Sequence, residues 1–218
     1  MNEIYIYDDI GPDWAGMVSA KFVIGELAKY KDEPVTVRIN SPGGFVSEGQ
    51  AIYNALRRHS QGGHKVTIEV DALAASIASH IAMAGDEILM AENAMMMIHK
   101  AWTWMAGNAD AFRKEAGVLD KFDDILADTY VARSKADKAK IVQLLTDETW
   151  LTASEAVELG LADAIGQPLN IAASVKPGRF AKMPAFKTVE ELDREKERTA
   201  HIATARNQLR IARARAGV

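Results

Sequence analysis

Short runs rich in β-branched residues alternate along the chain with longer segments of helical periodicity. The strand-like runs lie at 3–7, 34–40, 65–70, 87–91 and 94–98, and helical segments lie at 17–30, 47–56, 76–84, 108–145 and 153–160. This alternation is typical of βαβ units, in which helices connect parallel strands. Ser47–Gln50 and Thr152–Glu155 have the spacing of capping boxes, which predicts that helices begin there. The pattern therefore predicts an α/β fold.

The chain is long enough, at 218 residues, for one substantial domain and an appendage. From residue 172 onward its composition becomes loop-like, and from residue 187 onward eight Lys and Arg stand against five Asp and Glu. We predict one domain over residues 1–175 and a linker with a charged tail over 176–218. The tail has few apolar residues, so we expect it to be dispensable for folding.

The composition excludes several classes of protein. Hydrophobic residues make up 48% and charged residues 26%, which is the balance of a soluble globular protein. No apolar run approaches the roughly 20 residues that span a bilayer, and the start lacks the features of a signal peptide. The chain has no cysteine, which excludes disulfides and thiolate metal sites. We expect a cytoplasmic protein with no membrane partner and, since its body is mildly acidic, no nucleic acid bound to that body.

Ser76 is the first candidate for chemistry. It directly follows a strand-like run and begins an apolar helix, so the partial positive charge of a helix N-terminus lies beside its hydroxyl. Small neighbours, Ala74 and Ala75, leave room for other backbone to approach. The alternative interpretation is a serine that merely caps the helix.

His99 is the leading candidate for a general base. It ends the strand-like run 94–98 and opens onto a loop, a position from which an imidazole can reach a neighbouring element. The alternative is a hydrogen-bonded surface histidine. His80 lies four residues after Ser76 but is a weaker candidate, because helical side chains lean toward the N-terminus of their helix. His59 and His64 flank a Gly-Gly turn and are interpreted as solvated loop residues.

Gly43 and Gly44 separate a strand from a helix. Glycines can adopt positive φ and leave backbone N–H groups uncovered for an anion or an oxyanion. The alternative is an ordinary tight turn. No Walker lysine follows, which argues against a nucleotide loop.

Taken together, these motifs resemble the Clp protease proteolytic subunit family in order and spacing. The matching segments are Ile-Asn-Ser-Pro-Gly-Gly at 39–44, Ala-Ala-Ser-Ile-Ala at 74–78, Met-Ile-His at 97–99 and Glu-Ala-Val-Glu-Leu-Gly-Leu-Ala-Asp at 155–163. The resemblance covers roughly residues 3–165 and implies a Clp/crotonase-like spiral of ββα units with a long handle helix at 108–145. A short chain with a charged C-terminal extension is also similar to the prohead maturation proteases of tailed bacteriophages.

The resemblance implies a serine endopeptidase that works without metal or cofactor. It assigns Ser76 as the nucleophile, His99 as the general base, and the N–H groups of Gly43 and Ile77 as the oxyanion hole. The family has an aspartate as third member, whereas counting back without gaps from Gly160 reaches Glu148, with Asp147 beside it.

The resemblance also implies partners. We expect protein or peptide substrates, such as capsid or scaffold proteins in the phage branch, and a homo-oligomeric ring in the host cytoplasm or the prohead. Because the chain begins almost directly at its first strand, we expect no docking to an ATPase. The alternatives are a host-type Clp subunit with an ATPase partner, a catalytically silent assembly or scaffolding protein, and a crotonase-type acyl-CoA enzyme.

Overall fold

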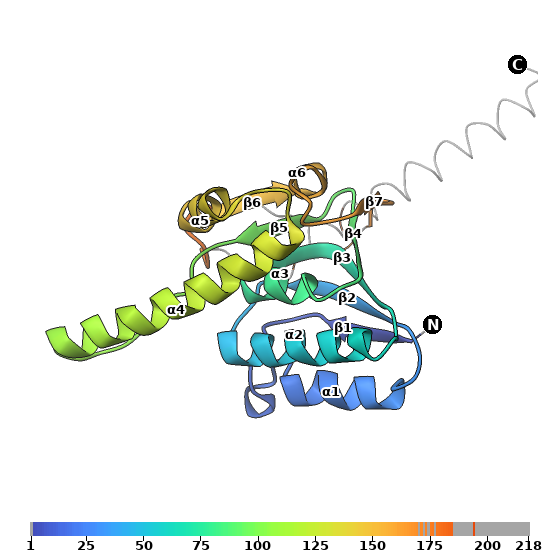
Figure 1. The fold of residues 1–218 in the computed structure, drawn as a ribbon, viewed down its shortest axis with the longest axis horizontal. Helices are drawn as coiled ribbons and strands as arrows, with labels where there is room; N and C mark the ends of the chain where they lie inside the picture. Colours follow the sequence, from blue (N-terminus) through green and yellow to red (C-terminus); the bar gives the residue numbers. More distant parts are fainter. Residues whose placement is uncertain are drawn as a thin grey trace, which may run out of the picture. The chain divides into compact units, whose positions relative to one another are not determined.

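The computed structural model describes residues 2–169, 171, 173, 175–176, 178–184 and 194. Its contacts divide the chain into two compact units, Met1–Leu169 with Ser174–Pro184, and Asn170–Ala173 with Ala185–Val218. The first unit carries the sheet and the candidate site, and only this unit is considered below (Figure 1). Most of the predicted tail lies outside the described residues, so its boundary at residue 175 stays a prediction.

The first unit is built on a mixed sheet that contains seven strands in the described residues. They are β1 (Glu3–Ile6), β2 (Val35–Ser41), β3 (Val66–Ala75), β4 (Glu87–Ala91), β5 (Met95–Ile98), β6 (Thr149–Thr152) and β7 (Ala164–Gly166). The strand order is β1-β2-β3-β4-β7, and β5 pairs with both β3 and β6. Every pair is parallel except β5–β6. The predicted α/β fold class is confirmed.

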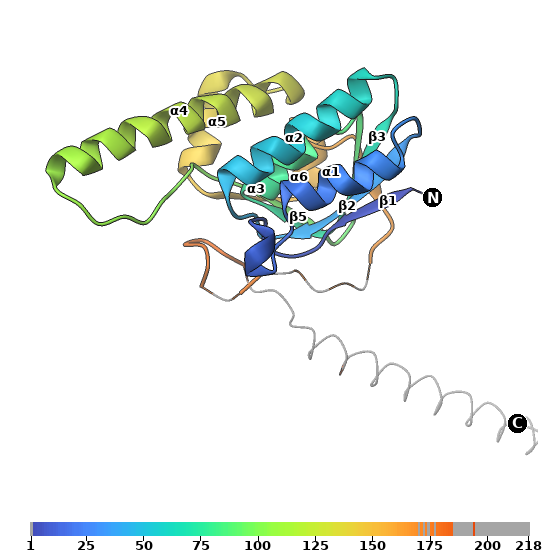
Figure 2. The same ribbon diagram turned by 90° about the horizontal axis from the view of Figure 1, so that it is seen from below.

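In the part of the chain that the structure describes, six α-helices accompany these strands. They are α1 (Ala20–Lys29), α2 (Val46–Gln61), α3 (Ile77–Ala82), α4 (Ala109–Arg133), α5 (Lys138–Thr146) and α6 (Ala153–Leu159). Helices α1, α2 and α3 lie together on one face of the sheet (Figure 2). Helix α4 is the long handle that extends away from the sheet (Figure 1). Within the described part of the chain, no helix is both long and apolar enough to cross a membrane.

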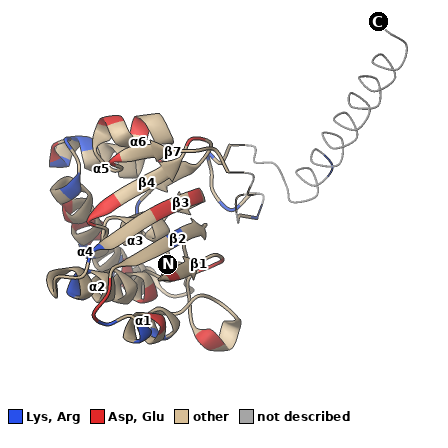
Figure 3. Cartoon of the chain, turned by 90° about the vertical axis from the view of Figure 1, so that its right-hand side faces the viewer, with Lys and Arg blue, Asp and Glu red and all other residues tan. Residues whose placement is uncertain are grey.

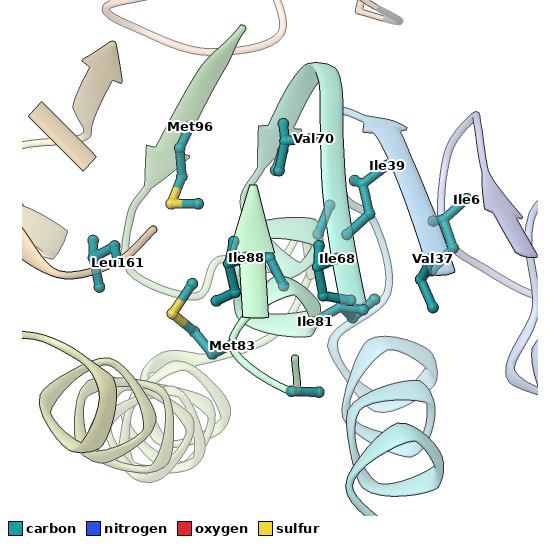
Figure 4. Close-up of a cluster of buried hydrophobic side chains, with 14 of the residues drawn as sticks. Ile6, Val37, Ile39, Ile68, Val70, Ile81, Met83, Ile88, Met96 and Leu161 are labelled. Atoms are coloured by element: carbon teal, nitrogen blue, oxygen red, sulfur yellow. The ribbon is translucent and has the colours of Figure 1, made fainter. Parts of the chain in front are cut away.

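The core lies between the sheet and the helices. On β2, Val37 and Ile39 are fully buried while Arg38 between them stays partly exposed, as strand alternation requires. Ile68 on β3 and Ile81 on α3 meet in this layer (Figure 4). Burying a side chain of this size contributes about 1.5–3 kcal/mol. The core therefore fixes α3 firmly beneath the end of β3.

A buried ion pair joins β2 to β3, which lie side by side in Figure 3. Arg38 donates to both carboxylate oxygens of Asp71, with Nε and Nη2 at 2.9 and 2.6 Å, and its Nη1 donates to Glu69 at 2.6 Å. Such bidentate pairs are geometrically specific. Asp71 is only 1% exposed. The pair holds the strand that leads to Gly43 beside the strand that leads to Ser76.

Several predicted elements differ from those observed. Strand β3 was expected to end near residue 70, but it continues to Ala75 because it exchanges β4 for β5 as its neighbour. The predicted helix over 108–145 is two helices, α4 and α5, separated by a turn in which Asp137 caps α5. Strands β6 and β7 were not predicted.

The two expected capping boxes have different outcomes. Thr152 and Glu155 form the box at the start of α6, which confirms that prediction. The expected box at Ser47–Gln50 is wrong, since α2 begins after Phe45 and no side chain caps it.

Candidate active site

Ser76 occupies a tight turn between β3 and α3. Its φ of +56° and ψ of −130° are rarely adopted by residues other than glycine, so the backbone is strained there. The Ser76 N–H donates to the Met97 carbonyl at 2.9 Å, which fastens the turn to β5. The Ser76 side chain makes no capping hydrogen bond to α3. The hydroxyl is therefore free to face the cavity that Ser76 lines. The interpretation of Ser76 as a serine that merely caps the helix is wrong.

His99 meets Ser76 across two neighbouring strands. Strands β3 and β5 pair in parallel with Ala75 opposite Met97, so their carboxyl ends coincide. The His99 Nε2 atom lies 2.7 Å from Ser76 Oγ, within hydrogen-bonding distance. Burial is the main cause that lowers the pKa of His99 below its ordinary 6.5, and the charge of Arg179 lowers it further. A neutral imidazole at neutral pH can accept the proton of the hydroxyl.

The other described histidines lie elsewhere. His80 is fully buried in α3, with its ring 4.7 Å from the ring of Tyr53, and neither ring nitrogen has a hydrogen-bond partner in the described residues. His59 and His64 contact each other at the end of α2, with ring centroids 5.3 Å apart. Of these four histidines, the one brought to the hydroxyl of Ser76 is His99.

Glu148 lies close to His99 and Asp147 points elsewhere. The charge of Glu148 raises the pKa of His99, in opposition to burial. The Asp147 carboxylate instead accepts a hydrogen bond from the Gln143 amide at 2.8 Å. The described part of the chain contains no hydrogen bond between Glu148 and His99. The Glu148 carboxylate accepts hydrogen bonds from the backbone N–H groups of residues 181 and 182 and, at 3.4 Å, from the Trp150 indole N–H.

Gly43 and Gly44 lie close beside Ser76. Gly43 has a φ of +86°, and a Cβ placed on it would lie 2.7 Å from both the carbonyl oxygen of Ala75 and Cβ of Ser76. The Gly43 N–H donates to Ser41 Oγ at 3.1 Å, so it is already occupied. By contrast, the N–H groups of Gly44 and Ile77 have no acceptor among the described residues. Gly44 and Ile77 both line the cavity beside Ser76, whereas Gly43 does not.

A cavity of about 590 Å³ opens beside Ser76 and His99. Much of its wall is apolar and comes from segments far apart in the chain: Met17, Phe45, Leu119, Phe122 and Leu126. Trp102 and Trp104, in the segment after His99, also line it. A cavity of this size, lined by apolar side chains with a few polar groups, suits an extended peptide side chain or a small ligand. In the described residues, no cluster of three or more His, Asp and Glu could hold a metal ion.

Sequence reasoning missed the residues that approach the site from the far C-terminal side. Arg179 and Phe180 line the cavity, and the Phe180 ring contacts the ring of His99. They lie in the segment interpreted as a linker, beyond the motifs. The only sequence signal was a single arginine–phenylalanine pair between Gly178 and Pro184.

Comparisons with known proteins agree with this geometry. Residues 1–168 match the family model described as Clp protease. The ATP-dependent Clp protease proteolytic subunit of Nephroselmis olivacea is 30% identical over 137 residues, which is 62% of this chain and 64% of that relative. The chain thus matches less than two thirds of the relative's length. The family match covers most of the chain and includes Ser76, His99 and Glu148. The chain belongs to the Clp protease family.

Proposed function

We propose that this chain is a serine endopeptidase that cleaves peptide bonds through an acyl-enzyme on Ser76. The observation that supports it most is the 2.7 Å distance between Ser76 Oγ and His99 Nε2 at a strained turn from strand to helix. A nucleophile within hydrogen-bonding distance of a neutral base is the arrangement that acyl transfer requires.

In the first half of the reaction, Ser76 Oγ attacks the peptide carbonyl while His99 Nε2 accepts the hydroxyl proton. The carbonyl oxygen becomes an oxyanion, and His99 then gives the proton to the leaving amine as the C–N bond breaks. In the second half, His99 takes a proton from water, the resulting hydroxide attacks the ester, and Ser76 recovers its proton. Donors aimed at the oxyanion contribute about 3–4 kcal/mol each to transition-state stabilisation.

The oxyanion donors that we propose are the N–H groups of Ile77 and Gly44. The family resemblance implied Ile77 and Gly43, but the Gly43 N–H donates to Ser41 Oγ. Gly44 is the next residue, it lines the cavity, and its N–H is free of acceptors in the described chain. Gly43 serves instead as the close-packing residue that brings this backbone against the Ser76 turn.

We propose Glu148 rather than Asp147 as the acid that stabilises the His99 imidazolium. Its charge acts on His99, whereas the Asp147 carboxylate is bound to Gln143. Loss of the orienting acid costs on the order of 10⁴ in turnover in other triads. We expect Glu148→Ala to lose most activity and Asp147→Ala to keep it. If Asp147→Ala is the crippled variant, the assignment is wrong.

The substrates that we propose are proteins with an apolar side chain next to the cleaved bond, because the cavity wall beside Ser76 is largely apolar. We further propose capsid or scaffold proteins as the physiological substrates, in a host cytoplasm or a prohead. The support for this narrower proposal is the charged C-terminal extension alone, and the curated relative bears the name of a proteolytic subunit of an ATP-dependent protease. Coexpression of a capsid or scaffold protein with wild type or Ser76→Ala tests it through the loss of processing.

A homo-oligomeric ring is proposed from helix α4. Phe112, Val118 and Ile125 on this helix are 50%, 37% and 49% exposed, so a monomer leaves three apolar side chains in contact with water. Light scattering on a chain that ends near Pro184 tests both the ring and the dispensable tail. A stable monomer would refute the ring, and an insoluble product would refute the dispensable tail.

The peptidase proposal itself is tested with a fluorophosphonate probe, which labels activated serines. We expect labelling of wild type, no labelling of Ser76→Ala and strongly reduced labelling of His99→Ala. Ser47→Ala is the matched control, because Ser47 lines the same cavity and, in the described residues, the serine hydrogen-bonded to His99 is Ser76. Labelling that survives in Ser76→Ala would leave the silent assembly protein as the better explanation. Coenzyme A binding with no dependence on Ser76 would favour a crotonase-type enzyme.

A further inference from the structure

We propose that residues 178–184, called the 178–184 loop below, position the catalytic base and acid of this site. The role rests on the peptidase function proposed above. The loop lies beyond the residues matched by the family, which end at 168, yet its backbone and side chains contact His99, Glu148 and Gly43. Three sets of contacts support the role.

The first set fixes the Glu148 carboxylate. The Lys182 N–H donates to Oε1 at 2.5 Å and the Ala181 N–H donates to Oε2 at 3.0 Å, so each oxygen is held by one amide. Burial alone would raise the pKa of Glu148, but these two hydrogen bonds, a third from the Trp150 indole N–H and the charge of His99 together outweigh it, and the pKa is lowered. A carboxylate can accept about four hydrogen bonds, so the two amides and the Trp150 indole N–H, which donates to Oε1 at 3.4 Å, leave capacity for the imidazolium N–H of His99. The loop thus keeps the acid ionised and restricts its direction.

The second set holds the His99 ring. The ring of Phe180 stands edge-on to that of His99, with centroids 5.5 Å apart and an interplanar angle of 83°. It stands in the same way against Trp150, at 5.7 Å and 72°. Phe180 is only 8% exposed. Edge-to-face pairs of this kind contribute about 0.5–1.5 kcal/mol beyond area burial, which restricts the imidazole to one orientation.

The third set fastens the loop at both sides of the site. Arg179 pairs with Asp9, donates to the Gly43 carbonyl at 3.4 Å, and lies 5.7 Å above the ring of Phe180. The Lys182 ammonium donates to the Asp147 carbonyl. The loop therefore connects the segment that contains Gly43, after β2, with the segment that contains Asp147 and Glu148, before β6. Strands β2 and β6 are not neighbours in the sheet.

The cavity beside Ser76 shows whether the 178–184 loop leaves the site open or blocks it. With the loop in place, Ser76 and His99 still line an open cavity of about 590 Å³, and Arg179 and Phe180 form part of its wall. The loop is thus a wall beside the reacting atoms and leaves the hydroxyl accessible. Its removal should lower the rate of reaction, whereas removal of a plug would raise it.

The test uses the full-length chain with Phe180→Ala, the ring-conserving Phe180→Tyr, and Phe22→Ala as the control. Phe22 is a partly exposed phenylalanine on α1, outside the cavity. We expect Phe180→Ala to reduce the rate of fluorophosphonate acylation of Ser76 by about 10- to 100-fold, the scale of a displaced catalytic group. Phe180→Tyr should restore most of the rate, and Phe22→Ala should leave it unchanged. A rate that rises or stays the same in Phe180→Ala overturns the proposal.

A second measurement does not depend on activity. Because burial lowers the pKa of His99, opening its ring to water should move the NMR titration of His99 to higher pH in Phe180→Ala but not in Phe22→Ala. The His99 signal is identified from its absence in His99→Ala. Arg179→Met repeats both measurements with the Phe180 ring retained, and we expect the same directions.

The outcomes separate the two proposals. An unchanged His99 titration in Phe180→Ala overturns the role of the loop, whatever Arg179→Met shows, because loss of the Arg179 charge by itself raises the pKa of His99. If the His99 titration shifts in Phe180→Ala but the fluorophosphonate probe does not label Ser76 of the wild type, the contact between the loop and His99 is supported. The peptidase function is then contradicted.

Discussion

The close approach of Gly43 to the Ser76 turn gives the sharpest prediction from this structure. In Gly43→Ala the new Cβ would lie 2.7 Å from the Ala75 carbonyl oxygen and from Cβ of Ser76, and 3.0 Å from the Ile77 nitrogen. All three are backbone or near-backbone atoms of the turn that carries the hydroxyl, so no flexible side chain can yield. The substitution must move the Ser76 turn, the Gly43 strand or both.

The magnitude has two parts. A non-glycine residue at a positive φ costs roughly 1–2 kcal/mol, and overpacking a rigid site costs about 1–3 kcal/mol more. Gly63 separates them, because its φ is +92° and a Cβ there would meet nothing within 4 Å. We expect Gly63→Ala to lose only the conformational part, roughly 1–2 kcal/mol, and Gly43→Ala to lose about 2–5 kcal/mol.

Urea unfolding of both variants measures the free energies, and fluorophosphonate labelling measures the site. Gly63→Ala should label Ser76 at the wild-type rate, whereas labelling of Gly43→Ala should fall by about 100-fold or more because the hydroxyl is displaced. Equal destabilisation of the two variants, or normal labelling in Gly43→Ala, would refute the reasoning from close contact.

Two further predictions concern the buried groups behind the nucleophile. Burial lowers the pKa of His80 from 6.5 to about 4. The folded state therefore binds this proton less readily than the unfolded state, so stability should be complete above about pH 6.5 and fall by up to ~3 kcal/mol as the pH drops toward 4. Urea unfolding against pH should show that His80→Phe flattens this slope, and an unchanged slope would assign it to other groups. Tyr130 bonds at 2.8 Å to the hydroxyl of Ser79, which itself lies 2.6 Å from the Ser76 carbonyl oxygen. We expect Tyr130→Phe to cost about 0.5–1.5 kcal/mol, Ser79→Ala about 1–3 kcal/mol, and the double variant less than their sum; additive values would mean that the two groups do not interact.

The sequence by itself determined what depends on neighbours along the chain. Alternating burial at Val37, Arg38 and Ile39 follows from the strand period, and the Thr152–Glu155 box follows from spacing within one helical turn. The motifs around Ser76 and His99 indicated the pair of residues that the structure places 2.7 Å apart. In the first two cases a local pattern carried the information, because residues a few positions apart meet whatever the rest of the chain does. Ser76 and His99 are 23 positions apart, and their pairing was predicted from the family resemblance.

Tertiary structure decided the features that depend on which distant segments become neighbours. Strand β3 extends to Ala75 because its second half pairs with β5, whereas its first half pairs with β4. The amino-acid types of residues 71–75 do not indicate this change of neighbour. The Gly43 N–H donates to Ser41, and Gly44 is the glycine that lines the cavity. This arrangement accompanies the close approach of Gly43 to the Ser76 turn, which is a contact between distant parts of the chain.

The surroundings of Glu148 show the same limit most clearly. Counting along the chain placed Glu148 near His99, but the amides that hold its carboxylate come from residues 181 and 182, more than 30 positions later. Backbone N–H groups are the same in every residue except proline, so their use as donors leaves no trace in the side-chain sequence. Only the path of the folded chain brings them to Glu148.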